Sequence, residues 1–259
     1  MNMTGNTILI TGGTSGIGLE LARGFQKLGN VVIVTGRDEA KLAKARQAIP
    51  EVKTLRSDVG EAKEIEALHA TIVRDFPALN VLINNAGVMR RINLNAEGES
   101  LDTLTGEVEI NLMGPIRMVA KFLPLLRQKK EAAIVNVSSG LAFVPLPTSP
   151  IYCATKAALH SYTRSLRVQL KNSPVKVFEL APPATQTDLL TSSSDAEDMK
   201  GVSVMPLEEL VRQAMRGFER DNLEIRPGQS NQLRFMNRVA PEFILAQLSK
   251  PVDRMLRDG

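Results

Sequence analysis

Short apolar runs alternate with longer amphipathic stretches along most of the chain. The apolar runs are rich in β-branched side chains, which is typical of strands that are buried on both faces. Between them, apolar residues recur at the spacing of an amphipathic helix. We expect strands at residues 7–10, 31–34, 52–55, 81–83, 133–137 and 175–180. We expect helices at residues 17–28, 38–48, 62–76, 104–127 and 151–170.

This alternation predicts an α/β fold, a doubly wound parallel sheet of the Rossmann type with helices on both faces. Right-handed crossovers place successive helices on the two sides of such a sheet. No repeat or linker interrupts the pattern, so we expect a single domain over residues 1–259. From residue 207 the tail reads as helix, a short extended piece near residues 224–226, and one or two terminal helices.

The segment after the sixth predicted strand differs in composition from the rest of the chain. Residues 182–205 are rich in Pro, Thr, Ser and Asp. They begin at the carboxyl edge of the predicted sheet, where ligands bind in open α/β sheets. A mobile lid and an ordinary exposed loop are both compatible with this composition.

The composition narrows the possible classes of protein. Of the residues, 43% are hydrophobic and 23% charged, as in an ordinary globular protein. One cysteine and two histidines make a disulfide impossible and a metal site unexpected. Lys and Arg (32) are interspersed with Asp and Glu (28), so we expect a mildly basic surface and no nucleic-acid partner. No apolar run approaches the roughly 20 residues of a membrane span, and no signal peptide is recognisable, so we expect no membrane partner and a cytoplasmic location.

A glycine-rich segment, TGGTSGIG at residues 11–18, lies between the first predicted strand and the first predicted helix. Glycine permits a tight turn with positive φ, and N–H groups at a helix N-terminus attract phosphate. A glycine-rich turn alone is a weak signal, but this placement is the one that a dinucleotide-binding turn needs. Gly12, Gly16 and Gly18 are therefore candidate residues of a pyrophosphate site.

The end of the second predicted strand bears on which nucleotide is bound. Sites for NAD place an acidic side chain here to bind the ribose hydroxyls. Gly36 leaves that position empty, and the guanidinium of Arg37 suits the 2′-phosphate of NADP. Asp38 is better placed as the N-cap of the next helix. The sequence favours NADP over NAD, with a solvated loop arginine as the alternative reading.

Tyr152 and Lys156 stand one helical turn apart and share a helix face. An ammonium near a phenol favours the phenolate and lowers the pKa of the tyrosine. A tyrosine tuned in this way can give a proton to a carbonyl oxygen or take one from an alcohol. Ser138 and Ser139 end the fifth predicted strand, and a returning loop can bring Ser139 to the phenol.

These segments, in this order and spacing, resemble the short-chain dehydrogenase/reductase family. The matching motifs are TGGTSGIG at residues 11–18, NNAG at residues 84–87, Asn111 in EINLMG, Ser139 in VNVSSG, and the YxxxK motif of Tyr152 and Lys156. The resemblance covers residues 7–187, and residues 182–259 fall in the variable, substrate-binding part of the family. RPGQSNQL at residues 226–233 resembles the DltE-like oxidoreductase subgroup.

The resemblance implies catalytic roles for four residues. Tyr152 would be the general acid/base, and Lys156 would lower the pKa of Tyr152 and bind the nicotinamide ribose. Ser139 would bind the substrate oxygen, and Asn111 would hold a water in a proton relay. The residues implied in binding the cofactor are Gly12, Thr14, Ser15, Gly16, Ile17, Gly18, Arg37, Asp58, Val59, Asn85, Ala86, Gly87, Tyr152, Lys156, Pro182 and Thr187.

Two positions depart from the family pattern. Pro183 stands where the family usually has a glycine after Pro182, and proline lacks an N–H and fixes φ. Members that use NADP often carry a basic residue at the position of Ser15. Arg37 would then hold the 2′-phosphate with little help.

We therefore expect an NADPH-dependent oxidoreductase that interconverts a carbonyl and an alcohol, with Tyr152 as the general acid/base. Apolar residues between Ser139 and Tyr152 favour an apolar or aryl substrate. The resemblance implies a homodimer or homotetramer. One alternative is a non-catalytic nucleotide-binding regulator or sensor with the same fold. A hydrolase using Ser139 is a weaker one, because no G-x-S-x-G motif is present.

Four further residues lie near these motifs. We expect His160 to be a packed or interface histidine, and Cys153 to be a small buried hydrophobe rather than a nucleophile. Arg90 and Arg91 follow the NNAG segment, and they either border the active site or are solvated loop residues.

Overall fold

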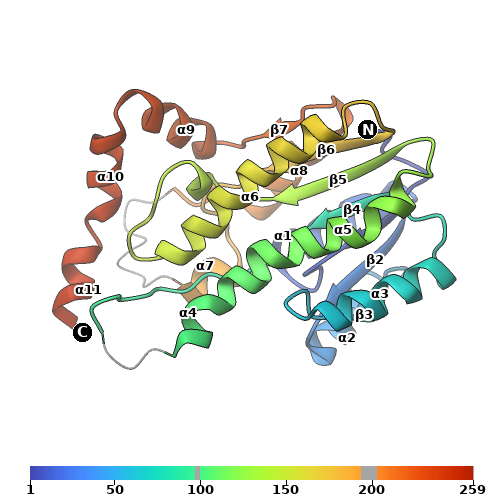
Figure 1. Ribbon diagram of the computed structural model, residues 1–259, viewed down its shortest axis with the longest axis horizontal. Helices are drawn as coiled ribbons and strands as arrows, with labels where there is room; N and C mark the ends of the chain where they lie inside the picture. Colours follow the sequence, from blue (N-terminus) through green and yellow to red (C-terminus); the bar gives the residue numbers. More distant parts are fainter. Residues whose placement is uncertain (97–99, 194–202, 259) are drawn as a thin grey trace.

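The computed structural model describes residues 1–96, 100–193 and 203–258 (Figure 1). In these residues seven strands form one parallel sheet in the order β3-β2-β1-β4-β5-β6-β7. The order reverses between β1 and β4, which makes the sheet doubly wound. The strands are β1 (Thr7–Ile10), β2 (Val31–Gly36), β3 (Lys53–Arg56), β4 (Val81–Asn84), β5 (Ala132–Val137), β6 (Val175–Leu180) and β7 (Glu224–Ile225).

Helices cover both faces of this sheet, as the alternating pattern predicted. The α-helices are α1 (Gly16–Lys27), α2 (Glu39–Ala48), α3 (Ala62–Asp75), α4 (Leu101–Val108), α5 (Gly114–Leu126), α6 (Pro150–Gln169), α7 (Asp188–Ser193), α8 (Leu207–Glu219), α9 (Gln229–Val239), α10 (Pro241–Ser249) and α11 (Val252–Asp258). A π-helical segment, η1 (Glu109–Met113), joins α4 to α5, and a short 3₁₀ helix, η2 (Gly140–Ala142), follows β5.

The period-2 alternation of the strands divides the core into two layers. Ile8 and Ile10 of β1 pack with Phe25 of α1 and Phe218 of α8 on one face. Leu9 of β1 points to the other face and packs with residues of α3, α5 and α6. Because both faces are covered, the central strands β1, β4 and β5 are buried along their whole length and consist mostly of apolar residues, and the predicted fold class is confirmed.

The helix predicted at residues 104–127 is longer and less regular than expected. It begins at Leu101, where the Ser100 hydroxyl accepts a hydrogen bond from the Thr103 N–H at 3.1 Å. At its middle the Gly114 N–H donates to the Glu109 carbonyl, five residues back. Pro115 has no N–H to donate, so the regular ladder cannot run through this point. π-Helical turns of this kind often mark functional sites.

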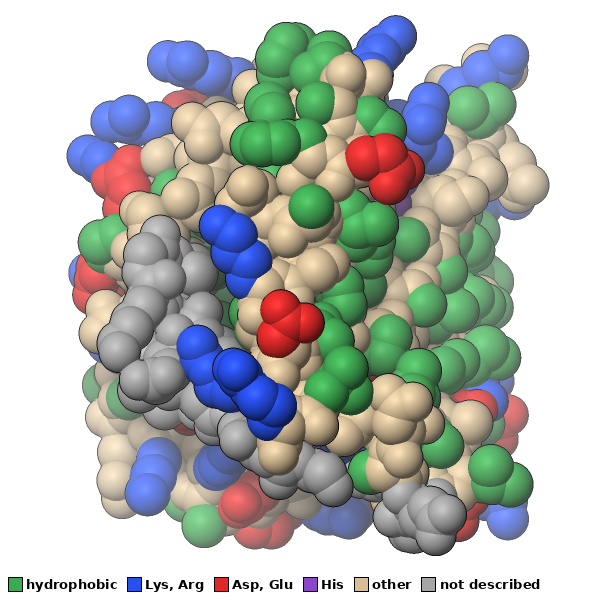
Figure 2. All heavy atoms as spheres, turned by 90° about the vertical axis from the view of Figure 1, so that its left-hand side faces the viewer, with side chains coloured by type: hydrophobic (Ala, Val, Ile, Leu, Met, Phe, Trp, Pro, Cys, Tyr) green, Lys and Arg blue, Asp and Glu red, His purple; other side chains and the backbone are tan. Residues whose placement is uncertain are grey.

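The tail holds three terminal helices in the described residues, rather than the one or two expected. The helices α9, α10 and α11 run as an arm along one side of the molecule, at the left of Figure 1. Hydrophobic side chains gather on this side in the space-filling view (Figure 2). Phe235, Val239 and Phe243 of the arm are exposed.

The segment expected to be a lid or a loop is only partly described, because residues 194–202 lie outside the described ranges. Its two ends are joined by backbone hydrogen bonds. The Gln186 N–H donates to the Met205 carbonyl at 3.2 Å, and the Met205 N–H donates to the Ala184 carbonyl at 2.9 Å. Among the described residues, no helix is long and apolar enough to cross a membrane.

Candidate functional site

A cavity of about 940 Å³ opens at the carboxyl ends of the central strands. Of the residues proposed from the sequence, all but Gly18 and Asn111 line it. A Cβ on Gly18 would lie 2.5 Å from the Gly12 carbonyl oxygen, so Gly18 packs beneath the glycine turn. Asn111 lies behind Gly87, whose Cβ position is 3.3 Å from the Asn111 Oδ1. The chain therefore brings its separate motifs to one edge of the sheet.

The glycine turn is tied to the segment that follows β4. Gly12 has a φ of 62°, and a Cβ there would lie 2.7 Å from the Ala86 Cα, so only glycine fits. The Asn85 side chain donates to the carbonyls of Thr11 and Gly12, both at 3.0 Å. The Thr11 hydroxyl accepts from the N–H groups of Asn85 and Ala86 at 3.0 and 3.1 Å. The Asn85 amide is thus used to hold the two loops together.

At the far end of the cavity, Arg37 faces Asp58 across the carboxyl ends of β2 and β3. Their closest nitrogen and oxygen atoms are 3.9 Å apart, and the Arg37 side chain is 63% exposed. A Cβ on Gly36 would lie 2.8 Å from the Thr14 Cγ2, so packing leaves no room for an acidic side chain there. Lys41, in the first turn of α2, also lines this end. Sequence reasoning missed Lys41, although its place one turn after Arg37 was a usable signal.

Asn111 joins three elements from within η1. Its Oδ1 accepts from the Val88 N–H at 2.8 Å, and its Nδ2 donates to the Val88 carbonyl at 2.8 Å. The Nδ2 also donates to the Thr155 hydroxyl of α6 at 3.2 Å. The side chain is fully buried. Asn111 therefore holds the segment after β4 against the helix that carries Tyr152.

Tyr152, Lys156 and Ser139 converge at the centre of the cavity. The Lys156 Nζ lies 5.6 Å from the centre of the Tyr152 ring and donates to the Val137 carbonyl at 3.0 Å. Burial raises the pKa of Tyr152 to about 12, and a hydrogen bond with the Ser139 hydroxyl opposes this rise. Burial lowers the pKa of Lys156 to about 8, and the Glu107 carboxylate opposes that change. Both side chains are therefore buried by the protein while they line the same cavity.

Glu107 is a buried carboxyl that sequence reasoning missed. It stands in α4 one turn before Asn111 and is fully buried, and within the described residues its carboxylate oxygens have no hydrogen-bond partner. Burial raises the pKa of Glu107, and the charge of Arg90 opposes this. In the sequence it reads as one polar residue of a helix surface, so no local signal marks it.

The remaining residues near the motifs have structural contacts. Arg90 donates to the Thr103 carbonyl at 2.7 Å and lies outside the cavity lining. The Cys153 thiol accepts from the Leu146 N–H at 3.1 Å, and burial raises the pKa of this thiol to about 11. Cys153 is therefore the buried hydrophobe that was expected, not an activated nucleophile. In the described residues, no group of three or more His, Cys, Asp and Glu side chains could hold a metal ion.

The far wall of the cavity is made by the C-terminal arm. The lining residues of α9 recur at the spacing of one helix face, and those of α10 continue the wall. They are Gln229, Gln232, Leu233 and Met236 of α9, and Ile244 and Leu248 of α10, followed by Pro251. The sequence analysis singled out residues 226–233 only for their resemblance to a subgroup and placed none of these residues in a cavity, because nothing local to the arm indicates that it folds against the sheet edge.

Comparisons with known proteins agree with this arrangement. A family model described as short chain dehydrogenase matches residues 6–198. The uncharacterized oxidoreductase DltE of Bacillus subtilis (strain 168) is 43% identical over 251 residues, which cover 96% of this chain and 98% of DltE.

Two solved structures are similar in fold and sequence. A short-chain dehydrogenase from Sphingobium yanoikuyae in complex with NADPH has a TM-score of 0.75 at 29% identity, covering 85% of this chain and 87% of its own. A 3-ketoacyl-(acyl-carrier-protein) reductase from Brucella melitensis complexed with NADH has a TM-score of 0.76 at 27% identity. The match covers 83% of this chain and 91% of the reductase chain. On the family match and the extent of this similarity, the chain belongs to the short-chain dehydrogenase/reductase family of oxidoreductases and is DltE-like within it.

Proposed function

We propose that the protein is an NADPH-dependent oxidoreductase that interconverts a ketone or aldehyde and the corresponding alcohol. The observation that carries the proposal is the convergence of Tyr152, Lys156 and Ser139 on one side of a cavity whose other end is a glycine turn at a helix N-terminus. The oxidoreductase family to which the chain belongs supports it.

The cavity is suited to a nicotinamide dinucleotide. Its glycine turn offers backbone N–H groups at the start of α1, where a pyrophosphate is stabilised. The Ser57 hydroxyl, buried and without a hydrogen-bond partner in the described residues, lies beside Asp58 at the far end. The two similar solved structures hold NADPH and NADH, so they support a nicotinamide cofactor of either kind. We favour NADPH because Arg37 and Lys41 provide two cations where an acidic residue would favour NADH.

The residues of the chain have distinct parts in the proposed reaction, for which the bound nicotinamide supplies the hydride. Tyr152 holds the proton that neutralises the carbonyl oxygen during reduction, and it takes that proton back during oxidation. Ser139 donates a hydrogen bond to the same oxygen as negative charge develops on it. Lys156 stabilises the phenolate that remains. Asn111 keeps the segment after Gly87 in place through its hydrogen bonds to Val88 and Thr155.

A pKa of about 12 means that Tyr152 holds its proton at neutral pH, which suits it to reduction. The substrate end of the cavity is lined by Leu141, Leu146 and the apolar residues of the arm, which favours an apolar or aryl carbonyl. The proposal includes a homodimer or homotetramer, for which light scattering coupled to size exclusion is the test. It also includes a cytoplasmic location.

The decisive experiment follows NADPH oxidation by its absorbance, with a panel of ketones and aldehydes, for the wild type and for Tyr152→Phe. We expect turnover by the wild type only, while NADPH binding, measured by its fluorescence, is retained in the variant. Tyr162→Phe is the matched control, because Tyr162 is the second of the two tyrosines and lies on the same helix. Equal turnover by wild type and Tyr152→Phe would overturn the mechanism. NADPH binding without turnover of any carbonyl would favour a nucleotide-binding regulator.

A further inference from the structure

One face of α6 bears a stripe of buried and partly buried polar residues that runs from the proposed active site to the other end of the helix. Its residues recur at intervals of four, three and four, so they lie above one another on the side toward the sheet. They are Lys156, His160, Thr163 and Arg167. Each of them bonds to the sheet. Lys156 donates to the Val137 carbonyl, and Arg167 donates to the Val177 carbonyl. The His160 ring contacts the Glu179 carboxylate, and the Thr163 hydroxyl accepts from the Asn136 amide.

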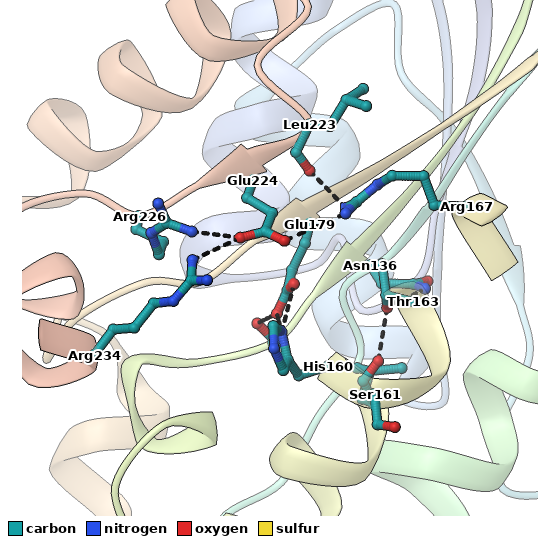
Figure 3. Close-up of polar contacts among 12 residues, drawn as sticks. Asn136, His160, Ser161, Thr163, Arg167, Glu179, Leu223, Glu224, Arg226 and Arg234 are labelled. Atoms are coloured by element: carbon teal, nitrogen blue, oxygen red, sulfur yellow. Dashed lines mark hydrogen bonds and ion pairs between the residues drawn. The ribbon is translucent and has the colours of Figure 1, made fainter. Parts of the chain in front are cut away.

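Glu179 of β6 is the least expected partner in this layer. Its side chain is almost fully buried. Its carboxylate accepts from the Ser138 hydroxyl at 2.5 Å and contacts the His160 Nδ1 at 2.8 and 3.0 Å. Figure 3 shows His160 and Glu179 pointing toward one another between α6 and the sheet. A carboxylate without such partners would be costly at this depth, so the two contacts account for its presence.

Ser138 connects this pair to the beginning of the loop that carries Ser139. Ser138 directly precedes Ser139, and its N–H also donates to the Leu180 carbonyl at 2.8 Å. Ser139 is the N-cap of η2, and its hydroxyl accepts from the Leu141 N–H at 3.1 Å. The direction of the Ser139 side chain thus depends on where the backbone of Ser138 is held.

His160 supports the other end of the same loop. Its ring meets the ring of Phe143, the C-cap of η2, edge-on with centres 5.1 Å apart. On the other side of Phe143, the Arg234 guanidinium of α9 lies 5.7 Å from the ring centre. Arg234 is itself fixed by Glu224 of β7 at 2.7 Å, as Figure 3 shows. The loop from Ser139 to Phe143 is therefore held at both ends.

We infer that Glu179 and His160 are positioning residues that set the place of the Ser139 hydroxyl relative to Tyr152. Glu179 acts through Ser138, and His160 acts through Glu179 and Phe143. The inference rests on the proposed function, in which Ser139 binds the substrate oxygen. Hydrogen-bond geometry is what the two residues supply, so a neutral side chain of the same shape can replace the carboxylate.

The test compares Glu179→Leu with Glu179→Gln. A glutamine can accept from Ser138 through its oxygen and donate to His160 through its nitrogen, whereas leucine can do neither. We expect Glu179→Leu to lower kcat by about tenfold to hundredfold, as a misplaced catalytic group does, with the Kd for NADPH unchanged. Glu179→Gln should keep most of the activity. Ser138→Ala removes the same bond with little change in volume, and we expect it to lower kcat even if Glu179→Leu does not fold.

Thr163→Val is the matched control, because it breaks the hydrogen bonds of Thr163 to the Asn136 amide and the Leu159 carbonyl in the same layer, and neither bond is to Ser138 or η2. We expect it to lower Tm but to leave kcat close to the wild-type value. An equal loss of kcat in Thr163→Val and Glu179→Leu would overturn the inference. So would equal activity of Glu179→Leu and the wild type.

A second measurement does not depend on turnover. Hydrogen exchange of the Leu141 amide reports the bond to the Ser139 hydroxyl directly. We expect faster exchange in Glu179→Leu and Ser138→Ala, and wild-type exchange in Glu179→Gln and Thr163→Val. If the wild type turns over no carbonyl, the proposed function fails, and this exchange pattern still decides the inference. Unchanged exchange in Glu179→Leu would then contradict it.

Discussion

Burial acts in opposite directions on the two residues of the YxxxK motif. It raises the pKa of the Tyr152 phenol to about 12 and lowers the pKa of the Lys156 ammonium to about 8, because each neutral form is easier to bury than its ion. The sequence predicted the pairing, but not the depth of burial. Desolvation is the largest effect on the pKa of Tyr152, and the group that lowers this pKa is the Ser139 hydroxyl rather than the expected Lys156.

These values predict the pH dependence of reduction. Lys156 loses its proton as the pH rises through about 8, whereas Tyr152 keeps its proton to about 12. The kcat/KM for carbonyl reduction, which reports the free enzyme, should fall as the pH rises through about 8. Glu107→Gln should move this fall in kcat/KM to lower pH, because the Glu107 charge favours the Lys156 ammonium. If the fall stays at the same pH or moves to higher pH, Lys156 is not the group that titrates.

A second residue-scale prediction concerns the choice of cofactor. Arg37→Asp replaces a cation with an anion at the far end of the cavity, so it should lower the ratio of kcat/KM for NADPH over NADH. A hydrogen bond to a charged group contributes about 1.5–3 kcal/mol, so the ratio should change by at least about tenfold. Lys44→Asp makes the same change of charge on α2 outside the cavity lining and serves as the control. An unchanged ratio in Arg37→Asp would contradict the NADPH assignment.

At the scale of elements, the start of α2 was predicted from the sequence together with its cap. Asp38 was expected as an N-cap, and its carboxylate accepts from the N–H groups of Ala40 and Lys41 at 2.8 and 3.1 Å. This bond pattern involves only near neighbours, so the sequence carries it. The π-helical turn at η1 was not predicted, although Pro115, which has no N–H to donate, interrupts the regular ladder at this point.

The cap leads to a prediction for stability. Asp38→Ala leaves two N–H groups at the start of α2 without their partner, so it should lower the free energy of unfolding by about 1 kcal/mol. Urea denaturation measures this value. Glu39→Ala is the control, because Glu39 lies in the same turn and is not the cap. A loss in Glu39→Ala equal to that in Asp38→Ala would assign the effect to charge near the helix end rather than to the cap.

At the scale of the whole molecule, the cavity is built from segments that are far apart in sequence. The glycine turn and strand ends form one side, while α9 and α10 close the other. The same arm also exposes the large hydrophobic side chains of Phe235, Val239 and Phe243. The arm therefore determines how much room the cavity leaves for a substrate.

The position of the arm predicts which variants change specificity. Leu248→Trp adds volume to the wall of the cavity, so KM should rise for bulky apolar ketones and change little for small ones. Gln247→Trp adds the same ring to the neighbouring exposed position on α10, outside the lining, and should leave both KM values as they are. Steady-state kinetics with a series of ketones of increasing size measures the difference. An equal rise in KM for small and bulky ketones would contradict a substrate site at this wall.

The sequence by itself determined the fold class, the family and the residues of the glycine turn, the strand ends and the YxxxK motif that line one side of the cavity. The fold class follows from the alternation of strand and helix patterns, the pyrophosphate turn from its glycines between a strand and a helix, and the family and the remaining site residues from the motifs that carry the resemblance. Only the tertiary structure decided that Glu107 and Glu179 are buried, that His160 pairs with Glu179, and that α9 and α10 close the cavity. The physical reason is that burial and pairing depend on neighbours that are distant along the chain, and a polar residue on a helix or strand reads the same in sequence whether it faces water or a partner.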